Sequence, residues 1–269
     1  EVPDKTWPEL IPTLDQGITK QSTNMGLRQA SLQALGYVCE EVPRGLDEYS
    51  SVILGAIAAG MNPAETDNDV KLAATTCLVN SIEFIKNNMD QEADRNNIMK
   101  MVFSVTSSPV EAVRAAAFSC LVQIANSYYK YLPPYMGTIF TLTASAIQGQ
   151  SRDVALNALE FWSTVADVEL ECMEEDADGA EDPSHRSRSH GIINQAVQTF
   201  SPVLLASLTQ QNEDIDDDEW GVSLAAGTCL GLCCQVAGNT LVQQALPFIN
   251  THVNSENWRF REAAILAFG

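Results

Sequence analysis

The feature that most constrains this 269-residue chain is an internal repeat with a period of about 43 residues. Six segments share one pattern, in which an apolar residue is followed three positions later by Ala or another small residue, and then by further apolar residues at helical spacing. The segments begin 43, 43, 41, 68 and 38 residues apart, at Leu27, Val70, Val113, Val154, Val222 and Phe260. The chain is therefore predicted to fold as a series of similar structural units.

Four of the five intervals lie close to the roughly 40–47 residues of HEAT and armadillo repeats, in which each unit is a pair of helices. Each of the six segments is predicted to begin the second helix of its pair. First helices are expected at residues 7–18, 46–61, 91–104, 135–147, 192–208 and 241–253. Asp69, Asp153, Asn257 and Trp220 stand just before second helices, where caps or tight turns belong.

No segment alternates with period two for long enough to form a sheet. The predicted fold is therefore all-α, a HEAT-repeat right-handed α-α superhelix or solenoid of about six helix pairs. The pairs are expected at about residues 1–41, 42–88, 89–130, 131–171, 188–238 and 239–269.

The 68-residue interval indicates one repeat that carries an insertion. Its composition changes between Cys172 and His190, where an acidic run is followed by Ser, Arg and His with almost no large apolar residues. Such a segment cannot bury enough apolar surface to form a core. We expect a flexible insertion at about residues 172–190.

The charge of the chain favours a basic protein or peptide as its partner. There are 35 acidic and 15 basic residues, so the net charge is −20. Nucleic acid would be repelled and is not expected as a partner. No stretch of 18 apolar residues is present, so no membrane insertion is expected. The chain stops inside a helical pattern, which is typical of a fragment.

No set of residues predicts catalysis, and we expect no enzyme, metal or cofactor. The seven cysteines lie mostly in apolar helical runs and are interpreted as core thiols, including Cys229, Cys233 and Cys234. His185 and His190 flank an Arg/Ser run without a fixed partner. The sequence contains no phosphate-binding loop and no nucleophile or zinc-protease motif.

The acidic residues form a more coherent group. In the stretch 212–220, six of nine residues are acidic and the last is Trp220. Glu160 and Asp167 are seven positions apart and therefore share one face of a second helix. Phe161 and Trp162 lie beside Glu160, so basic side chains could meet carboxylates and an indole there. Two alternatives remain open: Trp162 is core, and the stretch is a solvated turn.

Apolar or aromatic positions on first helices suggest a second kind of site. Leu54, Ala58, Ile98 and Tyr135 lie where grooves form between the first helices of adjacent pairs. Such grooves can accept an aromatic side chain from an unfolded peptide. Ordinary packing between repeats explains the same positions more simply and is the favoured alternative.

Seven segments of the chain, in this order, resemble the importin-β family of nuclear import karyopherins. They are DVKLAATT (69–76), EFIKNN (83–88), YYKYLPPYM (128–136), EFWS (160–163), DDDEW (216–220), LPFI (246–249) and WRFREAA (258–264). They extend over nearly the whole chain, which would correspond to part of the N-terminal half of a longer superhelix.

The resemblance implies a receptor that shuttles between cytoplasm and nucleus and gathers at the nuclear envelope rim. It implies binding of importin-α or another basic cargo signal, and of Ran-GTP. The matching positions are Glu160, Asp167, Asp216, Asp217, Asp218, Glu219 and Trp220.

The resemblance also implies binding of nucleoporin Phe-Gly repeats. The matching groove is Leu54, Gly55, Ala58, Asp94, Asn97 and Ile98, with a neighbouring groove that includes Tyr135. Bulkier residues are typical of the family where Ala58 and Asn97 stand. The alternative is a HEAT-repeat scaffold subunit, similar to a phosphatase scaffold, but the irregular 68-residue interval argues against it.

Overall fold

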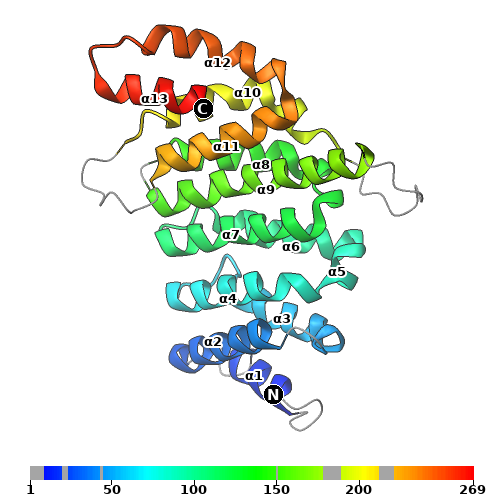
Figure 1. Cartoon of the computed structure of the whole chain (residues 1–269). Coiled ribbons are helices and arrows are strands. Elements are labelled where there is room, and N and C mark those ends of the chain that lie inside the picture. The colour runs from blue at the N-terminus through cyan, green and yellow to red at the C-terminus, as the bar shows by residue number, and fades with distance from the viewer. Residues whose placement is uncertain (1–8, 20–23, 43–44, 150, 178–188, 212–220) are drawn as a thin grey trace. The chain divides into compact units, whose positions relative to one another are not determined.

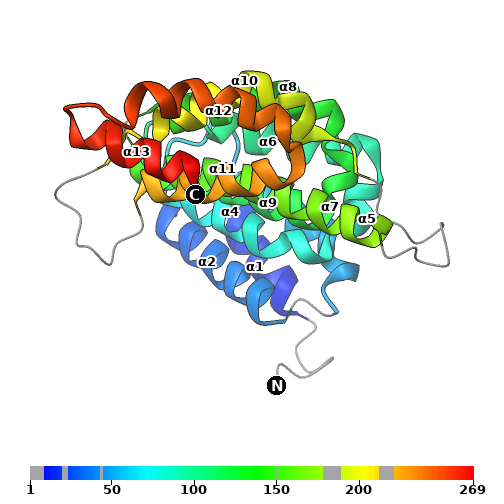
Figure 2. The same ribbon diagram turned by 45° about the horizontal axis from the view of Figure 1, so that its top comes forward.

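The computed structural model describes residues 9–19, 24–42, 45–149, 151–177, 189–211 and 221–269, and all regular structure in these ranges is helical. The chain divides into two compact units, one ending at Ser127 and the other beginning at Tyr128. Within each unit, helix pairs stack so that first helices form one layer and second helices form another (Figures 1 and 2).

In the first unit, the first helices α1 and α3 contact each other, and so do the second helices α2 and α4. A short extra helix, α5, precedes the third pair. The elements are α1 (Leu10–Thr19), α2 (Met25–Glu41), η1 (Asp47–Tyr49), α3 (Ser50–Gly60), α4 (Asn68–Ser81), η2 (Ile82–Phe84), α5 (Lys86–Asp90), α6 (Glu92–Val105) and α7 (Glu111–Tyr128), whose last residue belongs to the second unit.

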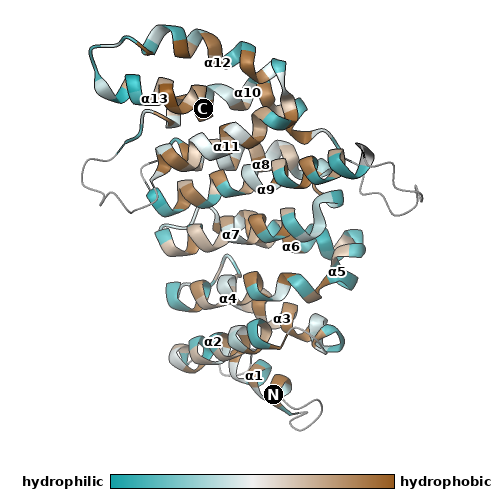
Figure 3. Ribbon diagram, viewed as in Figure 1, coloured by the Kyte–Doolittle hydropathy of each residue, from teal (hydrophilic) through white to brown (hydrophobic). Residues whose placement is uncertain are grey.

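In the second unit, α9 packs on α11 and α11 packs on α13, while α10 contacts both α8 and α12. Figure 3 shows apolar and polar residues mixed along each helix, as expected when one face is buried and the other is solvated. The elements are η3 (Tyr129–Tyr131), η4 (Pro133–Tyr135), α8 (Met136–Ile147), α9 (Arg152–Ala177), α10 (Ile192–Ser207), α11 (Val222–Ala237), α12 (Asn239–His252) and α13 (Trp258–Phe268).

The prediction of an all-α fold is confirmed for the described part of the chain. The second helices α2, α4, α7, α9, α11 and α13 begin within two residues of the positions at which the repeat pattern places them. Adjacent second helices also approach closely, as at a glycine of α2 outside the six-residue pattern. A Cβ atom at Gly36 of α2 would lie 3.5 Å from the Cα atom of Cys77 in α4.

Three of the four expected caps can be compared with the structure. Asn257 caps α13, since its side chain accepts a hydrogen bond from the backbone N–H of Arg259 at 3.0 Å. Asp69, in contrast, is the second residue of α4, and Asp67 is the cap. The carboxylate of Asp67 accepts bonds from the backbone N–H groups of Asp69 and Val70. Asp153 lies inside α9, and Trp220 lies outside the described residues.

The insertion predicted at 172–190 is wrong at its beginning. Helix α9 continues through Ala177, and Cys172 is buried. Val165, Glu169 and Cys172 follow one another at helical spacing on the buried face, so the core side of α9 does not end where the composition turns acidic. Glu and Met are also good helix formers. Residues 178–188 lie outside the described ranges.

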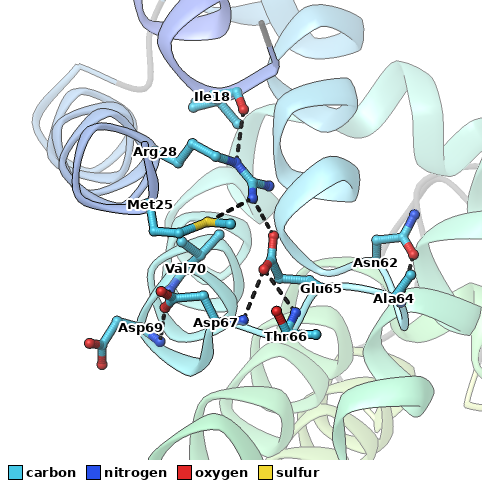
Figure 4. A network of polar contacts seen from close by, with 10 residues as sticks. All are labelled: Ile18, Met25, Arg28, Asn62, Ala64, Glu65, Thr66, Asp67, Asp69 and Val70. Carbon is cyan, nitrogen blue, oxygen red and sulfur yellow. Dashed lines mark hydrogen bonds and ion pairs between the residues drawn. The ribbon is translucent and has the colours of Figure 1, made fainter. Parts of the chain in front are cut away.

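A buried ion pair ties the first two helix pairs together (Figure 4). Nη1 of Arg28 in α2 lies 2.5 Å from Oε2 of Glu65, which precedes α4, and Nε of Arg28 donates to the carbonyl of Ile18 at 3.1 Å. Glu65 also accepts bonds from the N–H groups of Thr66 and Asp67. Burial alone would raise the pKa of Glu65, but these donors and Arg28 together lower it. The pair therefore fixes α2 against the start of α4.

Candidate partner-binding surfaces

The predicted acidic face of α9 is longer than the sequence suggested. Glu160 and Asp167 are both exposed. Three further exposed acids continue the same line at intervals of seven, seven, four and three residues, so they share one face of the helix. We name this set the acidic stripe, and it comprises Asp153, Glu160, Asp167, Glu171 and Glu174. It extends over about 32 Å at 1.5 Å per residue. The regular spacing is the signal by which the added residues could have been found.

Asp167 lies near the middle of the acidic stripe, and its carboxyl group is partly desolvated. Partial burial raises the pKa of its carboxyl group, because desolvation disfavours the charged form. A basic side chain placed beside it would favour the charged form again. The free energy of that contact would be modest, because exposed ion pairs are weak individually.

Trp162 belongs to the core, and its suggested contact with basic side chains is wrong. The indole is fully buried, and its N–H group donates to Oγ1 of Thr143 in α8 at 2.9 Å. Its ring stacks on that of Phe200 in α10, with centroids 4.3 Å apart. Phe161 is also fully buried. Residue 162 is two positions beyond Glu160, which turns its side chain by about 200° away from the exposed face.

A buried carboxylate fixes the start of α10. Glu169 of α9 has no exposed surface, and its Oε1 atom accepts bonds from the Tyr129 hydroxyl and the Ile192 N–H, both at 2.5 Å. Its Oε2 atom accepts from the Ile193 N–H at 3.2 Å. Burial and this carboxylate raise the pKa of Tyr129. The Tyr129 hydroxyl also accepts from the N–H of His190 at 2.9 Å. His190 and the first turn of α10 are therefore both held in place.

These contacts shape an apolar cleft between the first helices α8 and α10, which we name the α8/α10 cleft. Its volume is about 260 Å³. Apolar and aromatic side chains make up most of its lining, which comprises Pro133, Met136, Gly137, Phe140, Trp162, His190, Ile192, Gln195, Ala196 and Thr199. Tyr135, predicted to lie in such a groove, is half-buried and directly precedes Met136. The sequence pattern did not single out Phe140 or Ile192, because apolar residues on a first helix are equally typical of the core.

The residues matched to the main Phe-Gly groove belong to α3 and α6 and differ from one another in exposure. Leu54 and Ile98 are buried. Gly55 and Asn97 are exposed, and Ala58 and Asp94 are half-buried. Asp94 accepts a hydrogen bond from Nδ2 of Asn88 at 3.1 Å. The accessible part of this set is therefore small or polar, unlike the lining of the α8/α10 cleft.

The remaining predictions concern residues that belong to neither the acidic stripe nor the two groups of groove residues. Asp216, Asp217, Asp218, Glu219 and Trp220 lie outside the described residues, as does His185. All seven cysteines are free, and the interpretation as core thiols is confirmed for the six that are buried, whereas Cys234 is half-buried. In the described ranges, no group of three or more His, Cys, Asp or Glu residues could hold a metal ion, and no helix is long and apolar enough to span a membrane.

The sequence is similar to a known family over its whole length. Residues 1–164 match the family model described as IPO5-like, TPR repeats. The chain is 40% identical over 274 residues to importin subunit beta-1 of Schizosaccharomyces pombe, and 41% identical over 273 residues to that of Arabidopsis thaliana. In both comparisons all of this chain is covered, and it spans 31% of the length of the relative.

The fold is similar to solved structures of the same family. Yeast importin-β, Kap95p, superposes with a TM-score of 0.91 at 38% identity, covering 98% of this chain and 31% of that one. A complex of Kap95 with Nup1 gives 0.89 at 38% identity, covering 98% of this chain and 30% of that one. A structure in which Kap95p binding induces the switch loops of RanGDP to adopt the GTP-bound conformation gives 0.87 at 36% identity, covering 100% and 30%. The predicted HEAT-repeat solenoid is thereby confirmed.

Proposed function

The chain belongs to the importin-β family, and we propose that it forms part of a nuclear import receptor that acts by binding partners rather than by catalysis. The observation that carries this proposal is the separation of two surfaces. The α8/α10 cleft between first helices is apolar, whereas the acidic stripe on the second helix α9 is charged. An import receptor needs both chemistries, one for nucleoporin repeats and one for basic import signals.

The basic partner would bind along the acidic stripe. The importin-α adaptor or another basic cargo signal would place Lys or Arg side chains beside Glu160 and Asp167 through charge-assisted hydrogen bonds. Asp216, Asp217, Asp218, Glu219 and Trp220 would add a second acidic contact, shared with Ran-GTP. The complexes of Kap95 with Nup1 and with Ran support the inclusion of nucleoporins and Ran among the partners.

Nucleoporin Phe-Gly repeats would bind between first helices. The α8/α10 cleft beside Tyr135 offers apolar walls on which a phenyl ring can be buried. The α3 and α6 positions Leu54, Gly55, Ala58, Asp94, Asn97 and Ile98 are proposed as a second Phe-Gly site. Shuttling between cytoplasm and nucleus, with accumulation at the nuclear envelope rim, would follow from such binding.

Titration of the chain with a basic adaptor peptide, at two salt concentrations, tests the role of the acidic stripe. The variant Glu160→Gln/Asp167→Asn is expected to weaken binding about three- to tenfold at low salt, because each exposed ion pair contributes about 0.2–1 kcal/mol. The effect should shrink as salt screens the charges. The variant Glu256→Gln/Glu262→Gln removes two exposed charges elsewhere in the second unit and serves as the control. Equal affinities of the two variants would show that the stripe is not the contact.

A further inference from the structure

A second groove lies between the second helices α2 and α4 of the first unit, and nothing in the proposed function uses it. Its volume is about 210 Å³. Buried Leu32, Ala73 and Cys77 line its floor, and the helices approach closely where Gly36 faces Cys77. The other lining residues are Gln29, Gln33, Tyr37, Glu40, Asp69, Leu72, Thr76 and Asn80. We name this site the α2/α4 groove.

The charged residues that line the α2/α4 groove are all acidic. Glu40 and Asp69 are both exposed, and no Lys or Arg is among the described residues that line it. The carboxylate of Asp69 makes no hydrogen bond or ion pair within the described part of the chain. Tyr37 stands beside them with 67% of its surface exposed, which is unusual for so large an aromatic side chain. A cationic side chain is attracted both by carboxylates and by the face of such a ring.

The two acids mark opposite ends of the groove. Nδ2 of Asn80 in α4 donates to the carbonyl of Gly36 at 3.1 Å and to Oε2 of Glu40 at 3.3 Å, which places Glu40 at the Asn80 level. Asp69 lies eleven residues earlier on α4, about 16 Å away along the helix at 1.5 Å per residue. The Arg28–Glu65 pair holds the two helices in this register near the Asp69 end.

We propose that the α2/α4 groove binds an extended peptide segment that carries two basic side chains about five residues apart. An extended chain advances about 3.3 Å per residue, so five residues match the roughly 16 Å of helix length that separates the two ends of the groove. Each cation would pair with one carboxylate, and the amide groups of Gln33 and Asn80 can hydrogen-bond to the peptide backbone. The proposal rests on the proposed function in taking a basic partner, but it places a separate subsite in the first unit.

An apolar occupant fits this groove poorly. A phenyl ring at either end would desolvate a carboxylate without supplying a partner, which is costly. A lysine side chain, in contrast, can lay its methylene groups along Leu72 and Tyr37 and extend its ammonium group to the acid. The charge complementarity therefore selects a basic peptide rather than a Phe-Gly segment.

The test uses the full chain and a twelve-residue Gly/Ser peptide with two lysines five residues apart. Glu40→Gln/Asp69→Asn is expected to weaken binding at least fivefold at low salt, while Glu40→Gln still accepts the Asn80 bond. Glu83→Gln/Glu92→Gln removes two exposed charges outside the groove and should change affinity less than twofold. Peptides with lysines two or nine residues apart should bind at least threefold more weakly than the matched one.

A photoreactive residue placed between the two lysines should crosslink to residues 33–40 or 72–80, as mapped by mass spectrometry. Crosslinks to α9, with binding lost in Glu160→Gln/Asp167→Asn but not in Glu40→Gln/Asp69→Asn, would overturn this inference and leave the proposed function intact. Absence of lysine-peptide binding, or tighter binding of a Phe-Gly peptide at the groove, would also overturn it. Weakening by the groove variant alone supports it even if the acidic stripe proves silent.

Discussion

The α8/α10 cleft and the α2/α4 groove have similar volumes, about 260 and 210 Å³, but opposite chemistry. Each lies between corresponding helices of two successive pairs. The cleft separates first helices and is lined by Met136, Phe140 and Ile192, without a charged carboxylate among its described lining residues. The groove separates second helices and carries Glu40 and Asp69. The cleft between first helices thus fits an apolar ligand, whereas the groove between second helices fits a basic one.

The difference shows how one repeat supports two functions. Packing constrains only the face of each helix that points into the stack, since those residues form the core. The outward residues of first and second helices are free to differ. In the second unit the same division holds, because the acidic stripe lies on the second helix α9 while the apolar cleft lies between the first helices α8 and α10.

The largest expected effect comes from Glu65→Ala, which removes one partner of the buried ion pair. Arg28 would keep its charge while only 9% of its side chain is exposed, so the first unit should lose about 3–5 kcal/mol of unfolding free energy. Denaturant unfolding and amide hydrogen exchange of α2 and α4 measure the loss. Lysine-peptide binding should be lost and Phe-Gly binding by the α8/α10 cleft retained. Glu83→Ala, at an exposed site, is the control.

The pH dependence of the same pair has a defined sign. The pKa of Glu65 is lowered in the folded chain, so its stabilising contribution is present above the ordinary carboxyl pKa and is lost as pH falls through the folded value. In Glu65→Ala this acid-dependent part of the unfolding curve should be absent. A parallel pH dependence in the variant and the parent would contradict the assignment.

An intermediate effect is expected when the α8/α10 cleft is filled. Gly137 is exposed, and a Cβ atom there would meet nothing within 4 Å, so Gly137→Leu can place its side chain in the cleft without strain. Phe-Gly peptide affinity should fall about tenfold, or about 1.4 kcal/mol, with lysine-peptide binding unchanged. Calorimetric titration measures both.

Gly55→Leu is the matched comparison, because Gly55 is equally exposed and open but belongs to α3. A similar loss of affinity in both variants would indicate two Phe-Gly sites. A loss in Gly55→Leu alone would move the site from the α8/α10 cleft to α3 and α6.

The repeat period predicted the starts of the second helices to within two residues, because each helix repeats the same apolar spacing along its buried face. The sequence could not predict that α9 continues to Ala177. The acidic composition after Cys172 indicates only that those residues are solvated, whereas the buried residues Glu169 and Cys172 show that α9 still packs on the core there. The placement of Glu160 and Asp167 on one face of α9 followed from their spacing alone. Trp162 could not be assigned from its acidic neighbour, because its buried position depends on Thr143 and Phe200 from other helices.

Contacts between different helices also determine the ligand sites, and these contacts could not be predicted from the local sequence. Leu54 and Ile98 read as groove residues by their positions, but the structure buries both. The α2/α4 groove brings together residues about 40 positions apart, Glu40 with Asn80, and no local pattern announces that contact. Spacing along one helix can therefore be read from sequence, whereas a site made by two helices needs their register.

The smallest effect concerns Asp167 on the acidic stripe. Partial burial raises the pKa of this carboxyl, so its charge is complete only at a higher pH than is usual for Asp, and charging it costs the folded state some stability. Affinity for the basic adaptor peptide should therefore rise as pH increases through that pKa. Asp167→Asn should flatten this part of the profile and weaken binding at neutral pH by about 0.2–1 kcal/mol. Glu262→Gln, on α13, should leave the profile unchanged. A profile that keeps its slope in Asp167→Asn would show that a group other than Asp167 titrates.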